Sequence, residues 1–484
     1  MESARGDEAS ARAETPLAVR TTDVEDTSIR AFFDAAREAA VEDAGFGTEP
    51  ASTPRAVWRT PESGSVAAYG ASATCEANGP DRFASIRSRA RELFAALESD
   101  TDDSGTPGSF GTSSVPETTD GSSDPSTSET PRVARPRLFG GFSFFPDAHE
   151  GPWRGVPDAR FVLPATQFVS TDEEAWLTAI GDARAAESRL LDLRDRLASA
   201  ADPGPPEPSV IEHAERTTSE ATWRDQVDLA LSRIDAGALR KVVLAQSLRA
   251  TLDRPVSVPE ALSRLADTYP DCFVFSFPPG EGHRDFFGAT PERLVSMRGR
   301  DVATGALAGS VGRGETDAAD ERLASSLAAS EKDDREHSLV VEAIGDQLES
   351  LAASVTIGDR RVRKLATVQH LFTPIDARLA EDEHVLSLVE ALHPTPAVGG
   401  LPPDVAAETI REIEAFDRGW YAAPVGWFDA AGDGTFAVAI RSAVAEESRA
   451  TLFAGNGIVA GSDPAEEWTE VQLKYRPVLD ALGL

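Results

Sequence analysis

The second half of the chain is crowded with strand-like segments joined by short turns such as DAAGDG. These segments are rich in β-branched and aromatic residues and span 241–252, 272–279, 284–299, 434–446 and 450–461. A short turn can join only antiparallel neighbours, whereas a parallel pair needs a long crossover. This density of strands therefore predicts an α+β fold with large, mostly antiparallel sheets and helices packed outside them.

The helices that we expect also concentrate in this half of the chain, where apolar residues recur every three or four positions. They span 257–268, 317–330, 333–352, 385–392, 403–416 and 463–482. Upstream, 138–147 and 159–169 are Phe- and Val-rich strand candidates, and a helix is predicted around 173–200.

Composition divides the 484 residues into four parts. Residues 1–98 contain helix-like patches and have no role that can be read from the sequence. Residues 99–137 open with a long run of Ser, Thr, Asp, Glu, Gly and Pro, which predicts a disordered insertion or surface loop. We expect 138–209 to add strands and a helix to the main fold, and 210–484 to form the dense main domain.

Charge and cysteine content exclude several classes of protein. The net charge of −34 disfavours nucleic acid and anionic membranes as partners. No apolar run reaches the length of a membrane helix, and the charged N-terminus does not resemble a secretory signal. The two cysteines cannot make a disulfide framework, so we expect a cytoplasmic protein. The charge fits a halophilic protein, and an ordinary acidic protein is the alternative.

Lysine is almost absent, with four lysines among 47 basic residues. They are Lys241, Lys332, Lys364 and Lys474. Arginine keeps its proton, whereas a buried lysine can lose one and act as a base. A chain that uses arginine almost everywhere should keep lysine mainly where arginine cannot serve, although each lysine could also be an accidental survivor.

Two acidic pairs lie three residues apart on predicted helices, so each pair shares a helix face. They are Asp333 with Glu336, and Glu467 with Glu470. Two carboxylate pairs from separate helices could hold a hard dication such as Mg²⁺ and leave positions for water and a substrate carboxylate. The alternative is that both pairs lie on solvated helix faces.

Three further residues suggest acid–base and anion chemistry. Lys241 opens an apolar strand, where burial lowers an amine pKa, and Glu292 lies at a strand end among apolar residues, where burial raises a carboxyl pKa. Such a pair could serve as base and acid near neutrality, although the sequence cannot show that the two meet. Arg441 lies inside an apolar strand and needs an anionic partner, either a substrate carboxylate or a structural one.

The motifs fall in one order over residues 240–475 and together resemble the chorismate-utilising enzyme family, in particular its isochorismate synthases. They are KVVLAQ, FFGATPERLV, SEKDDREHSLVV, KLATVQHLFTPI, LHPTPAVGGLP, RGWYAAPVGW, AVAIRSA and AGNGIVAGSDPAEEWTE. The resemblance covers about half of the chain, and residues 1–130 do not share in it.

This resemblance implies two antiparallel sheets packed face to face around a Mg²⁺-dependent site for chorismate. Lys241 matches the base that deprotonates water, and Glu292 matches the acid that protonates the leaving hydroxyl. The matched metal ligands are Glu336 and Glu470, with Asp333 and Glu467 as further acidic partners. The matched substrate-binding residues are Gly309, Ser310, His370, Ala397, Tyr421, Arg441, Gly455 and Lys474.

Three positions narrow the expected activity within the family. Lysine at 241 resembles the enzymes that use water rather than ammonia, and Ala308 stands where some relatives have a nucleophilic lysine. Salicylate synthases usually have threonine where this chain has Ala397. The expectation is an isomerase that converts chorismate to isochorismate, for menaquinone synthesis rather than siderophores, and acts as a monomer.

Two alternatives stay open, namely a salicylate synthase or other chorismate-utilising enzyme and a non-catalytic chorismate-binding subunit. The chain also departs from the common family pattern at Gln246, Ala423 and Asn456. Asn456 is expected beside the pocket for the enolpyruvyl carboxylate. Of the three departures, it therefore bears most directly on the affinity for the substrate.

Overall fold

The computed structural model describes residues 17–44, 53–62, 64–98, 131–146, 149–199, 209–282 and 284–483. The expected disordered segment 99–137 therefore lies outside the described residues, except for 131–137.

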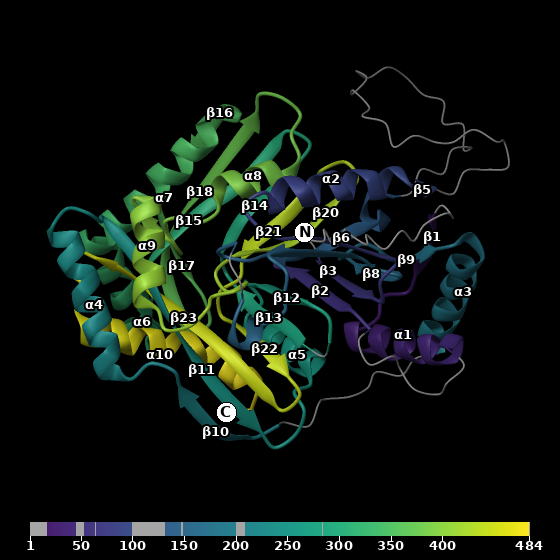
Figure 1. The fold of residues 1–484 in the computed structure, drawn as a ribbon, viewed down its shortest axis with the longest axis horizontal. Coiled ribbons are helices and arrows are strands. Elements are labelled where there is room, and N and C mark those ends of the chain that lie inside the picture. Colours follow the sequence, from purple (N-terminus) through teal and green to yellow (C-terminus); the bar gives the residue numbers. More distant parts are fainter. Residues whose placement is uncertain are drawn as a thin grey trace, which may run out of the picture.

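Two large sheets are packed face to face and carry helices on their outer faces (Figure 1). The larger sheet has 13 strands, in the order β10 (Ile211–Arg216), β11 (Lys241–Leu252), β23 (Arg449–Val459), β22 (Ser442–Glu446), β13 (Arg284–Thr290), β12 (Phe273–Phe277), β2 (Arg55–Thr60), β3 (Gly64–Tyr69), β8 (Thr166–Ser170), β9 (Ala175–Gly181), β1 (Leu17–Val24) and β5 (Leu97–Glu98), with β19 (Gly400–Leu401) beside β11. The other sheet has 10 strands, in the order β16 (Ala352–Ile357), β18 (Val368–Leu379), β15 (Asp301–Gly312), β14 (Arg293–Arg298), β21 (Gly434–Val438), β20 (Pro424–Asp429), β6 (Arg137–Phe142), β7 (Ala159–Leu163) and β4 (Ala73–Ala77), with β17 (Arg361–Lys364) beside β18. Within the described ranges only β1 and β5 pair in parallel, which confirms the α+β fold of mostly antiparallel sheets.

Ten α-helices surround the sheets in the part of the chain that the structure describes. They are α1 (Ile29–Ala44), α2 (Arg82–Ala95), α3 (Ala183–Ser199), α4 (Glu220–Asp235), α5 (Val258–Thr268), α6 (Asp317–Ala329), α7 (Glu331–Glu349), α8 (Val385–Leu392), α9 (Pro403–Ile413) and α10 (Pro464–Ala481). The two helices that carry the acidic pairs start at side-chain caps: the Ser330 hydroxyl accepts from the backbone N–H of Asp333, and Asp463 caps α10. Helix α7 packs on β15 and α10 packs on β23, so both acidic pairs lie next to the sheets.

Three segments that the sequence presents as single strand runs are each divided between the two sheets. Residues 159–169 give β7 and β8, 284–299 give β13 and β14, and 434–446 give β21 and β22. Proline interrupts the first two runs, at Pro164 and Pro291, where the missing N–H ends the strand ladder. The third run breaks before β22, at Arg441, whose φ of 51° is incompatible with a strand.

The helix predicted around 173–200 is wrong in its first part. Residues 175–181 form strand β9 between β8 and β1, and α3 begins only at Ala183. The segment AWLTAIG can follow either periodicity, and pairing with two neighbouring strands decides in favour of the strand.

The described N-terminal residues belong to the same two sheets as the rest of the chain. Their helices are α1 and α2, and β2 pairs with β12 of the downstream chain while β4 pairs with β7. One continuous apolar cluster, which includes Trp58, Phe142 and Phe275, runs through this part and through the downstream part. The cluster gives the site between the sheets a rigid frame.

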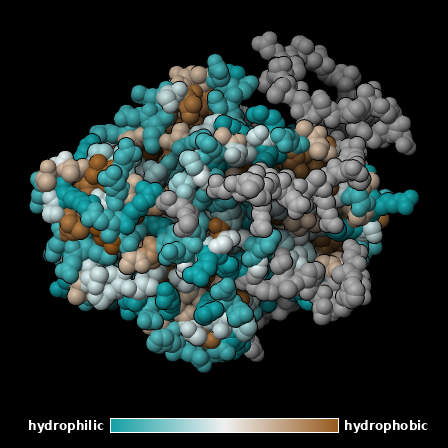
Figure 2. Space-filling view, in the orientation of Figure 1, coloured by the Kyte–Doolittle hydropathy of each residue, from teal (hydrophilic) through white to brown (hydrophobic). Residues whose placement is uncertain are grey.

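The molecular surface agrees with the acidic composition. The face drawn in Figure 2 is mostly hydrophilic, with apolar residues in small groups. Among the helices of the described segments, none combines the length and the hydropathy needed to cross a membrane.

Candidate active site

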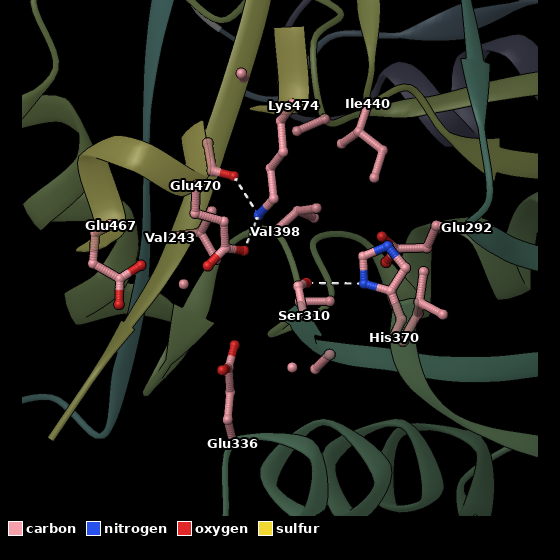
Figure 3. A pocket seen from close by; sticks show the side chains of 18 of the residues that line it. Val243, Glu292, Ser310, Glu336, His370, Val398, Ile440, Glu467, Glu470 and Lys474 are labelled. Carbon is pink, nitrogen blue, oxygen red and sulfur yellow. Dashed lines mark hydrogen bonds and ion pairs between the residues drawn. The ribbon is translucent and has the colours of Figure 1, made fainter. Parts of the chain in front are cut away.

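A cavity of about 380 Å³ lies between the two sheets, where α7 and α10 approach them (Figure 3). Its walls come from β11 and β23 of the larger sheet and from β15 and β18 of the other sheet. Every residue that the sequence analysis assigned to a site lines this one cavity. These residues are Lys241, Glu292, Gly309, Ser310, Asp333, Glu336, His370, Ala397, Tyr421, Arg441, Gly455, Glu467, Glu470 and Lys474.

The two candidate acid–base residues are both buried in this cavity. Lys241 begins β11 and is 1% exposed, and its Nζ lies 2.9 Å from Oε1 of Glu336. Glu292 lies between β13 and β14 and is 7% exposed. Burial raises the pKa of Glu292 to about 7, although the positive charges of Lys241, Arg441 and Lys474 act against the rise. Glu292 can therefore hold a transferable proton near neutrality, as an acid catalyst must.

The four acidic residues approach the cavity from two helices, with Asp333 and Glu336 on α7 and Glu467 and Glu470 on α10. Burial and then the negative charge of Glu336 raise the pKa of Asp333. Burial and then the negative charge of Glu470 raise the pKa of Glu467. The charge of Glu470 on α10 also contributes to raising the pKa of Asp333 on α7, so the carboxylates repel one another both within each helix and between the helices. Extra positive charge there is therefore favourable.

Lysines supply part of that positive charge. Lys241 pairs with Glu336, Lys474 Nζ lies 3.0 Å from Glu470 Oε1, and Lys332 Nζ lies 3.2 Å from Glu467 Oε1. Three of the four lysines therefore line the cavity. Lys364 does not, because it pairs with Asp320 and Glu321 elsewhere on the molecule.

The carboxylates fit Mg²⁺ as a two-ligand site. No group of three His, Cys, Asp or Glu side chains in the described segments is arranged to hold a metal ion. Figure 3 shows Glu336 and Glu470 pointing from opposite helices into the same part of the cavity. Mg²⁺ is commonly bound by one or two carboxylates, with water and substrate oxygens completing its octahedron.

At the other end of the cavity, hydrogen bonds fix the proton of a buried histidine. Arg441 Nη2 lies 2.8 Å from His370 Nε2, and His370 Nδ1 lies 2.9 Å from Ser310 Oγ. A guanidinium can only donate, so Nε2 accepts, and Nδ1–H donates to Ser310. Burial, followed by the charge of Arg441, lowers the pKa of His370 well below its usual range, which keeps the ring neutral. The Ser310 hydroxyl is then available to donate into the cavity.

Arg441 keeps a second donor for a ligand. The residue is 5% exposed, and its buried Nη1 has no hydrogen-bond partner among the described residues. A buried guanidinium with an unused N–H group is suited to an incoming carboxylate. The positive φ of Arg441 directs it into the cavity from the point where the chain passes between the sheets.

Two glycines are required by close contacts at the cavity wall. A Cβ on Gly457 would lie 2.6 Å from Oε1 of Glu336, and a Cβ on Gly455 would lie 3.1 Å from the Tyr421 hydroxyl. Only glycine therefore lets the side chains of Glu336 and Tyr421 lie so close to the backbone at these positions. Burial raises the pKa of Tyr421, so its hydroxyl remains a neutral hydrogen-bond donor.

A buried ion pair behind the cavity was not found by sequence reasoning. Arg418 is bound to Glu414, and both side chains are nearly inaccessible to solvent. Arg418 also donates to the carbonyl oxygens of Val243, at 2.7 Å, and Val398, at 2.9 Å, both of which line the cavity. The i, i+4 spacing of Glu414 and Arg418 was the available signal, but it does not distinguish a buried pair from a surface pair.

Asn456 has a different environment from the one that the sequence analysis expected. Its neighbours Gly455 and Gly457 line the cavity, but the buried Asn456 side chain turns toward α10. Its Nδ2 donates to Glu467, at 2.9 Å to the backbone oxygen and 3.0 Å to Oε2, and its Oδ1 accepts from Lys474. Asn456 therefore orients the acidic end of the cavity.

Comparison with known proteins gives one consistent result. The sequence profile described as "Chorismate binding enzyme" matches residues 117–483. The isochorismate synthase MenF of Bacillus subtilis is 40% identical over 355 residues, which cover 72% of this chain and 75% of the relative. A salicylate biosynthesis isochorismate synthase of Pseudomonas aeruginosa is 39% identical over 360 residues, covering 72% of this chain and 74% of the relative. The solved structure of MenF, the menaquinone-specific isochorismate synthase of Escherichia coli, shares the fold with a TM-score of 0.71 and 23% identity, over 96% of this chain and 94% of that chain.

Proposed function

This chain belongs to the family of chorismate-binding enzymes, and we propose that it is an isochorismate synthase that converts chorismate to isochorismate. The observation that carries the proposal is that Lys241 and Glu292, the candidate base and acid, are buried in one cavity together with the carboxylates and Arg441.

The reaction is an addition of water at C2 of the ring with displacement of the C4 hydroxyl. Lys241 takes a proton from the attacking water, and the resulting hydroxide forms the new C–O bond. Both ring double bonds shift, from C1=C2 to C1=C6 and from C5=C6 to C4=C5, as the C4–O bond breaks. Glu292 protonates the departing hydroxyl, which leaves as water. One proton is gained by Lys241 and one is lost by Glu292, so atoms and charge balance.

Glu336 and Glu470 would hold Mg²⁺, with Asp333 and Glu467 as outer partners. When bound, the ion supplies positive charge for the ring carboxylate of the substrate. Lys241 then need not neutralise Glu336, and its amine can serve as the base. The support for this assignment is the mutual repulsion of the carboxylates and their placement on two facing helices.

The opposite end of the cavity would bind the enolpyruvyl carboxylate. The unused donor there is Arg441 Nη1, and we propose that the Tyr421 hydroxyl and the backbone at Gly455, which line the same cavity, add further contacts. Other lining residues would contact the ring of the substrate and orient it. Ser310 and His370 would lie on one side of the ring, and Gly309, Ala397 and Lys474 form the rest of the cavity wall around it. Salicylate synthases usually have threonine at the position of Ala397, so alanine there supports isochorismate as the final product.

We further propose that the enzyme acts in the cytoplasm as a monomer and serves menaquinone synthesis. The Bacillus relative shares the name MenF with the Escherichia coli enzyme, which is described as menaquinone-specific, and this supports that pathway. The Pseudomonas relative is named as an isochorismate synthase of salicylate biosynthesis, so it supports the same reaction and makes salicylate biosynthesis the alternative pathway. Salicylate synthase remains the alternative activity to test.

The deciding experiment is chromatography of the products after the purified protein is incubated with chorismate and Mg²⁺ in molar salt. We expect an isochorismate peak that disappears when a chelator is added and returns with excess Mg²⁺. Salicylate together with pyruvate would instead assign the chain to the salicylate synthases. Chorismate binding without any product would indicate a non-catalytic subunit.

A further inference from the structure

A second cavity, of about 390 Å³, lies between the same two sheets and adjoins the first. Glu292 and Leu307 line both cavities. The second cavity is bounded by β12 and the β2–β3 turn on one side and by β15, β17 and β18 on the other. Exposed residues, Glu62 and Arg361, lie at its rim, so the cavity reaches the surface.

Three arginines line this cavity, and two of them have no carboxylate partner in the described segments. Arg293 pairs with Glu62 at 2.8 Å. Among the described residues, Arg363 donates only to backbone oxygens, those of Pro291 and Asp271, at 3.3 and 2.8 Å.

The third arginine, Arg361, stacks on the ring of Phe372, as Arg363 does. Two adjacent guanidiniums without a carboxylate are unexpected in a chain with 81 acidic residues, where partners are abundant. Guanidinium groups bind carboxylates through paired N–H donors, so the unpartnered pair suits an anionic ligand.

The arginines form a series that leads from the surface toward the active cavity. Arg361 is exposed, Arg363 is half-buried, and Arg441 is buried in the active cavity. The charge of Arg363 acts on Arg441 and His370, because it contributes to lowering the pKa of both groups. The positive potential of the second cavity therefore extends into the active cavity.

We propose that the second cavity is an outer binding site for a dicarboxylate, which receives the substrate before it passes to Arg441. A protein with a net charge of −34 repels a dianion at long range. A local group of arginines at an entrance reverses that potential where the ligand must enter, as charged clefts do in other enzymes. The identity of the dicarboxylate as chorismate rests on the proposed function.

The test is a pair of charge reversals at exposed arginines. Arg361→Glu places a negative charge at the rim of the second cavity. Arg378→Glu, the matched control, makes the same change on β18 at a position that pairs with Asp301 and lines neither cavity. The association rate of chorismate is measured by stopped-flow tryptophan fluorescence at several ionic strengths. Circular dichroism first establishes the range of ionic strength over which each protein is folded, and the rates are compared within that range.

Arg361→Glu is expected to slow association at the lowest ionic strength, and the difference from wild type should vanish in molar salt, where charges are screened. Arg361→Glu changes the local charge by two units. For a divalent anion about 10 Å away in water, Coulomb's law with salt screening then gives an association rate about 3- to 10-fold lower at low ionic strength. Arg361→Gln should give a smaller effect of the same sign, and Arg378→Glu should remain within about twofold of wild type by the same screening argument.

Equal association rates for Arg361→Glu and Arg378→Glu at all salt concentrations would overturn the outer site. If chorismate does not bind the wild-type protein, the proposed function fails, and the outer site is then tested with malonate as a dicarboxylate probe. Calorimetric binding of malonate should be weaker for Arg361→Glu than for Arg378→Glu, and equal binding would reject the site.

Discussion

Replacing Glu292 by glutamine should change catalysis and stability in opposite directions. The substitution keeps the size and polarity of the side chain but removes the transferable proton. Glu292 is buried at 7% exposure, and its pKa is raised to about 7. The pKa is raised because a carboxyl group that is transferred out of water ionises less readily.

The catalytic effect follows from the loss of acid catalysis. We expect Glu292→Gln to lower kcat by about 10²- to 10⁴-fold. In the wild-type enzyme only the protonated carboxyl is active, so kcat should fall on the alkaline side of a pKa of about 7. At pH 8 about one-tenth of the molecules would carry the proton, which predicts about a tenfold loss per pH unit beyond that point.

The effect on stability has the opposite sign. The folded protein binds the Glu292 proton more tightly than the unfolded chain, so stability falls as pH rises from 4.5 to about 7 and stays lower above it. The pKa difference corresponds to about 3 kcal/mol. Glutamine cannot ionise, so Glu292→Gln should be more stable than wild type at pH 8 by up to that amount and should show no gain at pH 4.

Two measurements on the same preparations check this reasoning. Initial rates from product chromatography are collected from pH 6 to 9, and free energies of unfolding are obtained from denaturant titrations at pH 4 and 8. The control is Glu349→Gln at an exposed helix end, which should change neither quantity. Near-normal turnover by Glu292→Gln, or a loss of stability at pH 8, would refute the assignment of a buried acid catalyst.

Substitutions at three further residues test other parts of the site. Lys241→Ala should lower kcat by about 10²- to 10⁴-fold while chorismate binding persists in fluorescence titrations, and Lys241→Arg should not restore turnover because arginine keeps its proton. Asn456→Ala should weaken Mg²⁺ binding about 10-fold in calorimetry without substrate, since it frees Glu467; unchanged affinity would remove Asn456 from the metal end. Arg418→Ala leaves the Glu414 charge buried and unpaired, so chemical denaturation should show a loss of about 3–5 kcal/mol, and a loss below 1 kcal/mol would contradict the importance of this pair.

Much of the chemistry could be predicted from local sequence because it depends on residue types and short spacings. The helix spacing of Asp333 with Glu336 and of Glu467 with Glu470 places each pair on one face, and both pairs line the cavity. The scarcity of lysine was equally informative, since Lys241 and Lys474 both line the cavity. Helix ends were predictable where caps and prolines mark them, as at the start of α10.

The environment of individual polar groups could not be predicted, because it depends on residues far away in sequence. Lys332 on α7 forms an ion pair with Glu467 on α10. Asn456 on strand β23 donates a hydrogen bond to the same glutamate. The buried pair of Arg418 and Glu414 looks like any surface i, i+4 pair until the sheets and the loop that carries Val398 are packed around it.

The sequence by itself determined which residues can perform the chemistry and that the strands would pair mostly in antiparallel fashion. It did not determine where one strand run passes from one sheet to the other, because both halves of such a run have the same apolar pattern. Only the tertiary structure places the crossings after Thr290 and after Val438. These crossings bring Glu292 and Arg441 into the space between the sheets. Burial there raises the pKa of Glu292, so that the carboxyl can hold a proton near neutrality. It also leaves Arg441 Nη1 without a hydrogen-bond partner among the described residues, so that this donor is free for an anion.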